Sequence, residues 1–237
     1  MTVAKNLYRN YQDWKSWDDL FVYSADQAGY FEAEMADLSI EGAAVLEIGF
    51  GSGSCVAWME RKGAKVTVTE INESSCTAAR NRGLGVLSPN LPEIAHDHFR
   101  EFDTIVAFDV FEHLGWHDVD EFLHACAIML KDGGRLLLRF PNAQSPFGLV
   151  PQAGDPTHRV GLSLAAFRLF LVKYPYNVVR YSSARLNRGK FLTAVWLKRT
   201  IRRVLQLVIG KFLAFTYATK IPYEPVVVLV LEKNGRG

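Results

Sequence analysis

The sequence predicts a single α/β domain in which a mostly parallel β-sheet carries helices on both faces. Short apolar runs with strand character alternate with segments of helical periodicity along most of the chain. Two of these runs, residues 43–46 and 104–108, are each followed by an acid, Glu47 and Asp109, as expected where parallel strands deliver side chains to one edge of a sheet. The length of 237 residues and the hydrophobic content of 49% suffice for one large domain with a packed core.

Composition indicates a cytoplasmic protein. The three cysteines, Cys55, Cys76 and Cys126, are odd in number and lack metal-ligand spacing, so we expect reduced thiols. Acids interrupt the N-terminal region, so no signal peptide is expected. No uncharged run reaches the roughly 18–20 residues that a membrane span needs.

The first apolar run leads into a glycine-rich turn with the pattern of a ligand site. After Glu47, Gly49, Gly51 and Gly53 stand at alternate positions, and residues 55–60 then have helical character. A strand, a glycine turn and a helix N-terminus together present backbone N–H groups and a helix dipole to an anion.

One family of such turns binds dinucleotides through the fingerprint Gly-x-Gly-x-x-Gly. That fingerprint fits poorly, because Ser54 or Val56 would occupy its third glycine position. An oxidoreductase that uses NAD therefore stays as a weaker alternative.

A second predicted strand, residues 64–69, is also followed by an acid, Glu70. It lies 17 residues after Gly53, and in a doubly wound sheet this places it beside the turn of the first strand. A carboxylate there can accept hydrogen bonds from both hydroxyls of a ribose.

The predicted strand at residues 104–108 is followed by Asp109, Glu112 and His113. Ligands in open α/β sheets bind at the carboxyl ends of strands, so these side chains are candidate site residues. The remaining expected elements are helices over 73–82, 118–130 and 162–172, strands over 84–87, 177–183 and 225–231, and a fifth strand that follows a tight turn at Gly133 and Gly134 and leads to Asn142.

Three motifs resemble class I S-adenosylmethionine-dependent methyltransferases, especially the small-molecule types 11, 12 and 23. They are Glu47-x-Gly-x-Gly-x-Gly, Asp109-x-x-Glu-His-Leu and Leu130-Lys-x-Gly-Gly, which fall in the family's order within residues 44–142. The resemblance implies a Rossmann-like, seven-stranded, mostly parallel sheet with helices on both faces. In that fold the last strand is antiparallel, and here a helical insertion would precede it.

The resemblance also implies S-adenosylmethionine as the cofactor. The glycine turn would hold its methionine end, Glu70 its ribose, and Asn90 would lie near the adenine, where the family often has an aspartate. The expected cofactor-binding residues are Glu47, Gly49, Gly51, Gly53, Glu70, Asn90 and Asp109. The expected acceptor-side residues are Glu112, Asn142 and Asp155.

An Asp155-x-x-His158 loop resembles a bacterial subset of the family, in which it borders the acceptor pocket. His158 is the candidate general base, because a histidine can accept a hydroxyl proton near neutral pH. A loop or capping role for His158 is the alternative, and His113 is the reserve candidate. No metal is expected, because the pair His96 and His98 has no further ligand nearby in the sequence.

We expect three parts: an N-terminal helical cap over residues 1–40, a core over 41–184 and 222–237, and a helical insertion over 185–221. Aromatic residues recur in the cap, and Trp14, Trp17 and Phe21 have helical spacing. They either pack helices onto the core or form a lid over the substrate pocket.

The insertion has the pattern of a basic amphipathic helix in a segment without acids. Residues 156–223 contain 13 Lys and Arg and no Asp or Glu, whereas residues 1–155 contain 12 and 23. Three partners stay open: an anionic membrane surface through residues 190–220, the protein's own acidic half, and a second copy in a homodimer. Nucleic acid is not expected, because the basic residues are not interleaved with stacking aromatics.

The expected function is methyl transfer from S-adenosylmethionine to a small-molecule, sugar or lipid-linked acceptor. The main rival is a catalytically silent, methyltransferase-like binding subunit. The expected location is the cytoplasm, with peripheral attachment at the inner membrane face as an alternative.

Overall fold

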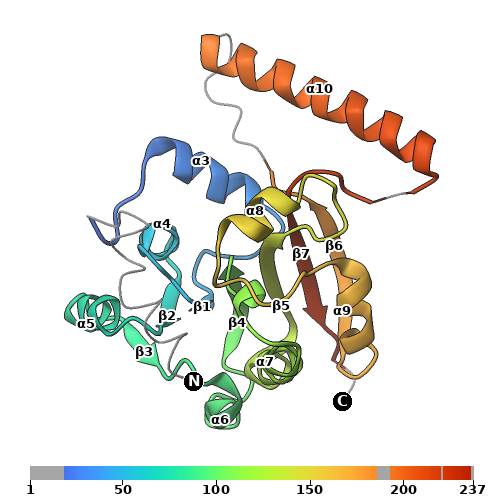
Figure 1. The fold of residues 1–237 in the computed structure, drawn as a ribbon. Coiled ribbons are helices and arrows are strands. Elements are labelled where there is room, and N and C mark those ends of the chain that lie inside the picture. Colours follow the sequence, from blue (N-terminus) through green and yellow to red (C-terminus); the bar gives the residue numbers. More distant parts are fainter. Residues whose placement is uncertain (1–18, 186–192, 220, 236–237) are drawn as a thin grey trace.

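The computed structural model describes residues 19–185, 193–219 and 221–235 (Figure 1). Seven strands form one sheet in the order β3-β2-β1-β4-β5-β7-β6. Strands β1 to β5 pair in parallel, and β7 lies antiparallel between β5 and β6. This confirms the predicted α/β class, the seven strands and the antiparallel last strand.

The strands are β1 (Ala44–Ile48), β2 (Lys65–Thr69), β3 (Gly85–Leu87), β4 (Phe102–Phe108), β5 (Leu130–Pro141), β6 (Tyr176–Ser183) and β7 (Val226–Lys233). The helices are α3 (Ala25–Glu34), α4 (Ser54–Arg61), α5 (Glu73–Asn81), α6 (Leu91–Ile94), α7 (Trp116–Met129), α8 (Leu149–Gly154), α9 (Leu164–Leu171) and α10 (Ala194–Tyr217), with a 3-10 turn η1 (Phe111–His113).

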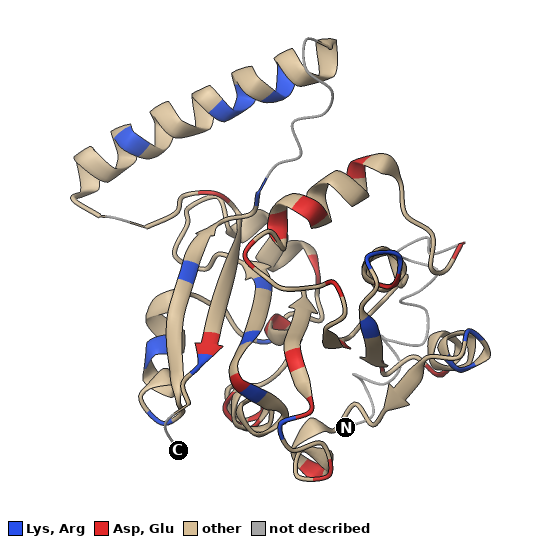
Figure 2. Cartoon of the chain, turned by 180° about the vertical axis from the view of Figure 1, so that it is seen from behind, with Lys and Arg blue, Asp and Glu red and all other residues tan. Residues whose placement is uncertain are grey.

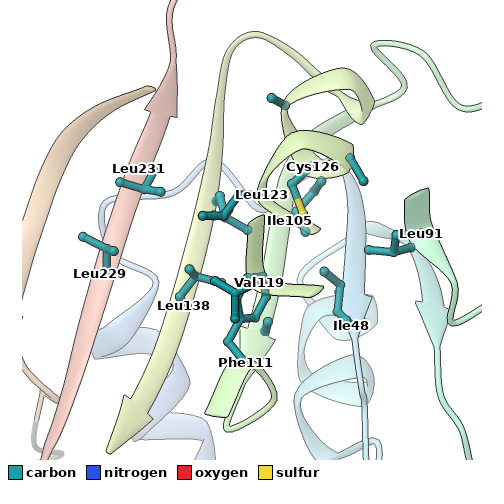
Figure 3. Close-up of a cluster of buried hydrophobic side chains, with 14 of the residues drawn as sticks. Ile48, Leu91, Ile105, Phe111, Val119, Leu123, Cys126, Leu138, Leu229 and Leu231 are labelled. Atoms are coloured by element: carbon teal, nitrogen blue, oxygen red, sulfur yellow. The ribbon is translucent and has the colours of Figure 1, made fainter. Parts of the chain in front are cut away.

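The core has two layers because successive residues of a strand face opposite sides of the sheet. In β7, Val228 and Val230 face a layer formed with α3, α4 and α5, whereas Leu229 and Leu231 face a layer formed with α6, α7 and α9. Figure 3 shows the second layer, where Leu123 of α7 packs near the sheet. The central strands β1, β4 and β7 are therefore buried on both faces, as is usual for a parallel sheet, whereas the edge strands β3 and β6 are mostly exposed or half-buried.

Parallel strands bring their carboxyl ends to one edge of the sheet. β1, β2, β4, β5 and β6 all point to this edge, because β6 is antiparallel to β7 and β7 is antiparallel to β5. The residues that follow these strand ends gather there, and the segment that leads into α10 starts from the same edge. We call this edge the carboxyl edge.

The turn predicted at Gly133 and Gly134 lies within the bounds of β5. The register there shifts from Phe102 opposite Leu130 to Thr104 opposite Arg135, so extra residues of β5 bulge out of the ladder. Gly133 has φ of 75°, which a glycine adopts without strain.

The predicted cap and insertion are each represented by one described helix. In the cap this helix is α3. Ser24 and Gln27 form a reciprocal capping box at its N-terminus. Trp14 and Trp17 lie outside the described residues. In the insertion it is α10, which projects away from the body (Figure 1). No helix in the described part of the chain is both long and apolar enough to cross a membrane.

Candidate functional site

The glycine turn lies at the carboxyl edge between β1 and α4. Gly49, Gly51 and Gly53 have φ of 64°, 55° and 71°, and the N–H groups of Gly49 and Phe50 donate to the Thr69 carbonyl at the end of β2. A Cβ on Gly49 would come within 2.7 Å of Val110 Cγ2. The turn therefore needs glycine both for its backbone conformation and for its close packing.

Glu70 joins the ends of β1 and β2. Its Oε2 accepts from the Gly51 N–H at 3.1 Å, and its Oε1 accepts from Ile71 N at 2.7 Å and Asn72 N at 3.1 Å. The fold thus places this acid beside the glycine turn, as the sheet topology predicted. Its contact with a ribose stays a prediction.

Glu47 is almost fully buried at the end of β1, close to Cys55 at the start of α4. Burial raises the pKa of Glu47 to about 8, an effect that a hydrogen bond from Cys55 reduces and the charge of Glu70 increases. Its Oε2 has no hydrogen-bond partner among the residues that the structure describes. Glu47 is thus a buried acid that retains its proton at neutral pH.

The segment before α3 lies over the glycine turn. Phe21 N donates to Ser52 O at 2.7 Å, and the Phe21 ring stacks on Phe50 with centroids 5.6 Å apart. A Cβ on Gly53 would come within 2.4 Å of the Phe21 ring. This contact is compatible with a lid, one of the two alternatives that the sequence left open for the aromatic residues of the cap. A neighbouring cavity, lined by residues 21–23 with Ala57, Glu60, Arg61 and Arg82, includes none of the predicted site residues.

Asp109 follows β4 with φ of 55°, and its N–H donates to Arg139 O at 2.9 Å. Its carboxylate lies 3.1 Å from the Arg139 guanidinium, which also lies over the rings of Tyr30 and Phe108. Arg139 and Tyr30 were missed from the sequence. The available signal was an arginine that interrupts the apolar run over residues 136–141 at the carboxyl end of β5.

Glu112, His113, Asp155 and His158 form a compact cluster at the same edge. His158 Nε2 lies 3.9 Å from Glu112 Oε1 and 3.9 Å from Asp155 Oδ2, and the two histidine rings have centroids 4.7 Å apart. The Arg159 N–H donates to the Glu112 carbonyl at 2.7 Å and fixes the loop against η1. The fold therefore brings together four predicted residues from two distant segments.

The two carboxyl groups of this cluster differ in their surroundings. Burial raises the pKa of Glu112 well above its usual value, and the charge of Asp109 raises it further. Burial alone would also raise the pKa of Asp155, but hydrogen bonds from the Thr157 hydroxyl and N–H hold it below the usual value. The pKa values of the two carboxyl groups are therefore displaced in opposite directions, a separation typical of functional sites.

The hydrogen bonds of His158 determine which nitrogen can act as a base. Its Nδ1 lies 3.0 Å from the Gln152 carbonyl, which can only accept, so Nδ1 carries the proton. Nε2 then keeps its lone pair and faces Glu112 and Asp155. The Nδ1 of His113 instead contacts the Thr157 hydroxyl at 2.8 Å. This geometry favours His158 over His113 as the base.

The same cluster contains the donors of a metal site. One ligand atom each from Glu112, His113 and His158 lies within 4.8 Å of the others. This set of one carboxylate and two imidazoles could hold a divalent ion. The expectation of no metal considered only His96 and His98, because residues 113 and 158 are far apart in sequence. His98 instead contacts Glu101 at 2.6 Å.

The two predicted asparagines lie in different environments. Asn90 is exposed after the end of β3, and its N–H donates to Ser88 Oγ at 3.2 Å. Asn142 is fully buried, and its amide donates to the Pro222 and Glu224 carbonyls at 2.8 and 3.3 Å. Asn142 thus ties β5 to the segment before β7, and we assign it a structural role.

Residues 46–136 match the model of a methyltransferase domain family. A ubiquinone biosynthesis O-methyltransferase of Xanthomonas oryzae pv. oryzae is 31% identical over 109 residues, which cover 44% of this chain and 45% of that protein. The match thus spans less than half the length of this relative.

Solved structures share the fold at low identity. An S-adenosylmethionine-dependent methyltransferase from Archaeoglobus fulgidus superposes with a TM-score of 0.66 at 18% identity, covering 90% of this chain and 96% of that one. A Burkholderia thailandensis 1,6-didemethyltoxoflavin-N1-methyltransferase, solved with bound S-adenosylhomocysteine, gives 0.60 at 14% identity, covering 98% and 87%. Together with the sheet order, these matches show that the chain has the fold of S-adenosylmethionine-dependent methyltransferases and is similar to a methyltransferase domain over residues 46–136.

Proposed function

We propose that this protein transfers a methyl group from S-adenosylmethionine to a hydroxyl of a small-molecule acceptor. The observation that best supports this proposal is the arrangement at the carboxyl edge. Glu70 is hydrogen-bonded to the glycine turn there, and the Glu112–His158 cluster lies at the end of β4. The name of the Xanthomonas relative, an O-methyltransferase, also supports an oxygen acceptor.

In this proposal the residues fit the cofactor at its polar ends. The glycine turn and the N-terminus of α4 hold the methionine portion. The Glu70 carboxylate accepts hydrogen bonds from the ribose hydroxyls, either in place of the hydrogen bond from the Gly51 N–H or in addition to it. Asn90 lies near the adenine, beyond the end of β3.

The bound cofactor supplies an electrophilic methyl on a sulfonium, which is already a good leaving group. The protein's own contribution is therefore mainly orientation, which can supply on the order of 7–11 kcal/mol. His158 Nε2 would accept the proton of the acceptor hydroxyl, and the cofactor would supply the methyl group that this oxygen takes up. Asp155 then stabilises the imidazolium that forms.

The acceptor class extends to sugars and lipid-linked compounds. A lipid-linked acceptor would reach the site from an anionic membrane surface and would place the protein at the inner membrane face within the cytoplasm.

Two measurements test the proposal. Thermal shifts with S-adenosylhomocysteine and with NAD separate methyl transfer from oxidoreduction, and we expect stabilisation by the first alone. Incubation with S-adenosylmethionine labelled on its methyl group, followed by separation of a cell extract into polar and lipid fractions, should give a labelled product. Binding of S-adenosylhomocysteine without any labelled product would instead favour the silent subunit.

A further inference from the structure

Helix α10 is the longest helix in the described part of the chain. It has 24 residues, starts at Thr193, whose hydroxyl accepts from Trp196 N at 3.1 Å, and buries none of its residues. Figures 1 and 2 show it projecting from the body. A helix of this length normally buries an apolar stripe, so its orientation is informative.

The side of α10 that faces the body is basic. Arg199 lies 2.8 Å from Asp26 at the start of α3, and Arg203 lies 3.4 Å from Glu224 before β7. Figure 2 shows acidic residues on α3 beneath the helix. The predicted contact between the insertion and the acidic half therefore exists, but it uses the polar side of the helix.

The opposite side is apolar and exposed. Its members recur at spacings of three and four residues, which places them on one stripe. We call this stripe the outer face; it consists of Leu197, Ile201, Val204, Leu205, Val208, Phe212 and Phe215, each more than half exposed. Phe215 is 88% exposed. A contiguous apolar surface of this kind indicates an interaction site.

Cations border the outer face on both sides. With about 100° per residue, Lys198 and Arg202 project beside Leu205, and Lys211 projects beside Val204 on the other border. The helix contains no acid. Lysine and arginine in such positions can extend their charged ends to lipid headgroups while their methylene groups lie along the apolar surface.

We propose that the outer face of α10 lies in the surface of a membrane that contains anionic lipid. The charges favour this occupant over a second copy, because two outer faces packed together would bring their bordering cations into the same interface. Asp26 and Glu224 already pair with the inner arginines. Anionic headgroups supply the missing negative charge, as for other interfacial helices.

The position of α10 connects this surface with the candidate site. The segment before α10 leaves the carboxyl end of β6, at the edge that carries Glu70 and Glu112. Attachment through α10 would therefore turn the carboxyl edge toward the membrane. This last step rests on the proposed function and favours a lipid-linked acceptor.

Vesicle flotation tests the proposal with the full chain. The vesicles contain phosphatidylcholine alone or with about 30% phosphatidylglycerol, at low and high salt. Two double variants probe the outer face and its border, Phe212→Ser with Phe215→Ser and Lys198→Glu with Arg202→Glu. The matched control, Arg61→Glu with Lys65→Glu, makes the same charge change elsewhere on the surface.

We expect binding to the anionic vesicles only, weakened by salt, with at least a tenfold loss in each α10 variant and none in the control. Absence of binding at low salt, or equal binding by all variants, would overturn the proposal. A dimer that Phe212→Ser with Phe215→Ser dissociates, without vesicle binding, would assign the outer face to a second copy. Binding of S-adenosylhomocysteine by each variant checks folding, and vesicle binding without methyl transfer would leave this proposal standing while the proposed function failed.

Discussion

The Gly51 N–H donates to Oε2 of Glu70 at 3.1 Å, so the acid that follows β2 is bonded to the glycine turn that follows β1. This bond places a carboxylate beside the backbone N–H groups of the glycine turn. The two groups recognise different parts of a nucleoside ligand, hydroxyls in one case and an anionic or polar end in the other.

Replacing Glu70 by alanine should weaken S-adenosylhomocysteine binding by roughly 10- to 100-fold, because hydrogen bonds to a charged group contribute about 1.5–3 kcal/mol. Isothermal titration calorimetry measures this change. Glu73→Ala is the control, since Glu73 is an exposed acid on α5 that pairs with Arg80. Unchanged affinity in Glu70→Ala would remove the ribose assignment.

Alanine substitutions at two glycines can separate the energetic cost of a steric clash from that of a left-handed backbone. Gly53 and Gly42 have nearly equal φ, 71° and 72°, but only a Cβ on Gly53 would meet another side chain, the Phe21 ring at 2.4 Å. Gly42→Ala should cost about 1–2 kcal/mol of unfolding free energy from the left-handed backbone. Gly53→Ala should cost more, and chemical denaturation measures both.

A second substitution identifies the source of the extra cost. Phe21→Ala combined with Gly53→Ala should recover the difference between the two glycine variants, because the clash is removed while the backbone strain stays. If the two glycine variants were equally destabilised, the packing of Phe21 over the turn would be wrong.

His158→Gln should lower turnover by about 10²- to 10⁴-fold on a hydroxyl acceptor while S-adenosylhomocysteine binding stays unchanged. The reason is that Nε2 is the basic nitrogen and lies beside Asp155. His117→Gln serves as the control, because His117 is exposed on α7. Intact turnover in His158→Gln, with a loss in His113→Gln, would transfer the role to the reserve candidate.

Removal of metal should leave turnover unchanged, although Glu112, His113 and His158 have the geometry of a ligand set. We expect this because burial favours a protonated Glu112, and a neutral carboxylic acid is a poor ligand. Turnover before and after dialysis against EDTA, with metal analysis of the purified protein, measures the effect. A loss that a divalent ion restores would make the cluster a metal site.

Much of the fold was predictable because the motifs lie at the strand ends. The alternation of apolar runs and acids located β1, β2 and β4, and the resemblance supplied the reversed last strand. The 3.6-residue period likewise predicted a helix in the insertion. Periodicity does not say which side of a helix meets the body, so the outward apolar face of α10 required the structure.

The site was predictable one segment at a time but not as a whole. Two helices and a strand separate Glu112 from His158 in the sequence, so neither their contact nor the metal-like geometry with His113 could be predicted from spacing. Asn142 follows β5 at the expected edge, yet it turns inward to the Pro222 carbonyl. Its direction depends on tertiary contacts that local sequence does not encode.

Glu47 predicts a pH dependence of stability. Burial raises its pKa from an ordinary value near 4.5 to about 8, so the folded state holds a proton that the unfolded chain releases between these values. The resulting stabilisation is complete below about pH 4.5 and is lost as the pH rises through 8. Stability should therefore fall by up to about 1.4 kcal/mol per pH unit within this window.

Glu47→Gln keeps the shape of the side chain and removes the titration. The free energy of unfolding of the variant, relative to that of the wild type, should increase by about 2–4 kcal/mol between pH 5 and pH 9. Urea unfolding without S-adenosylhomocysteine measures this change. Glu73→Gln, an exposed acid, should show no such gain. Parallel stability curves for the wild type and Glu47→Gln would mean that Glu47 is ionised in the folded protein, and its buried carboxylate would then need a cationic partner that the geometry at Cys55 does not provide.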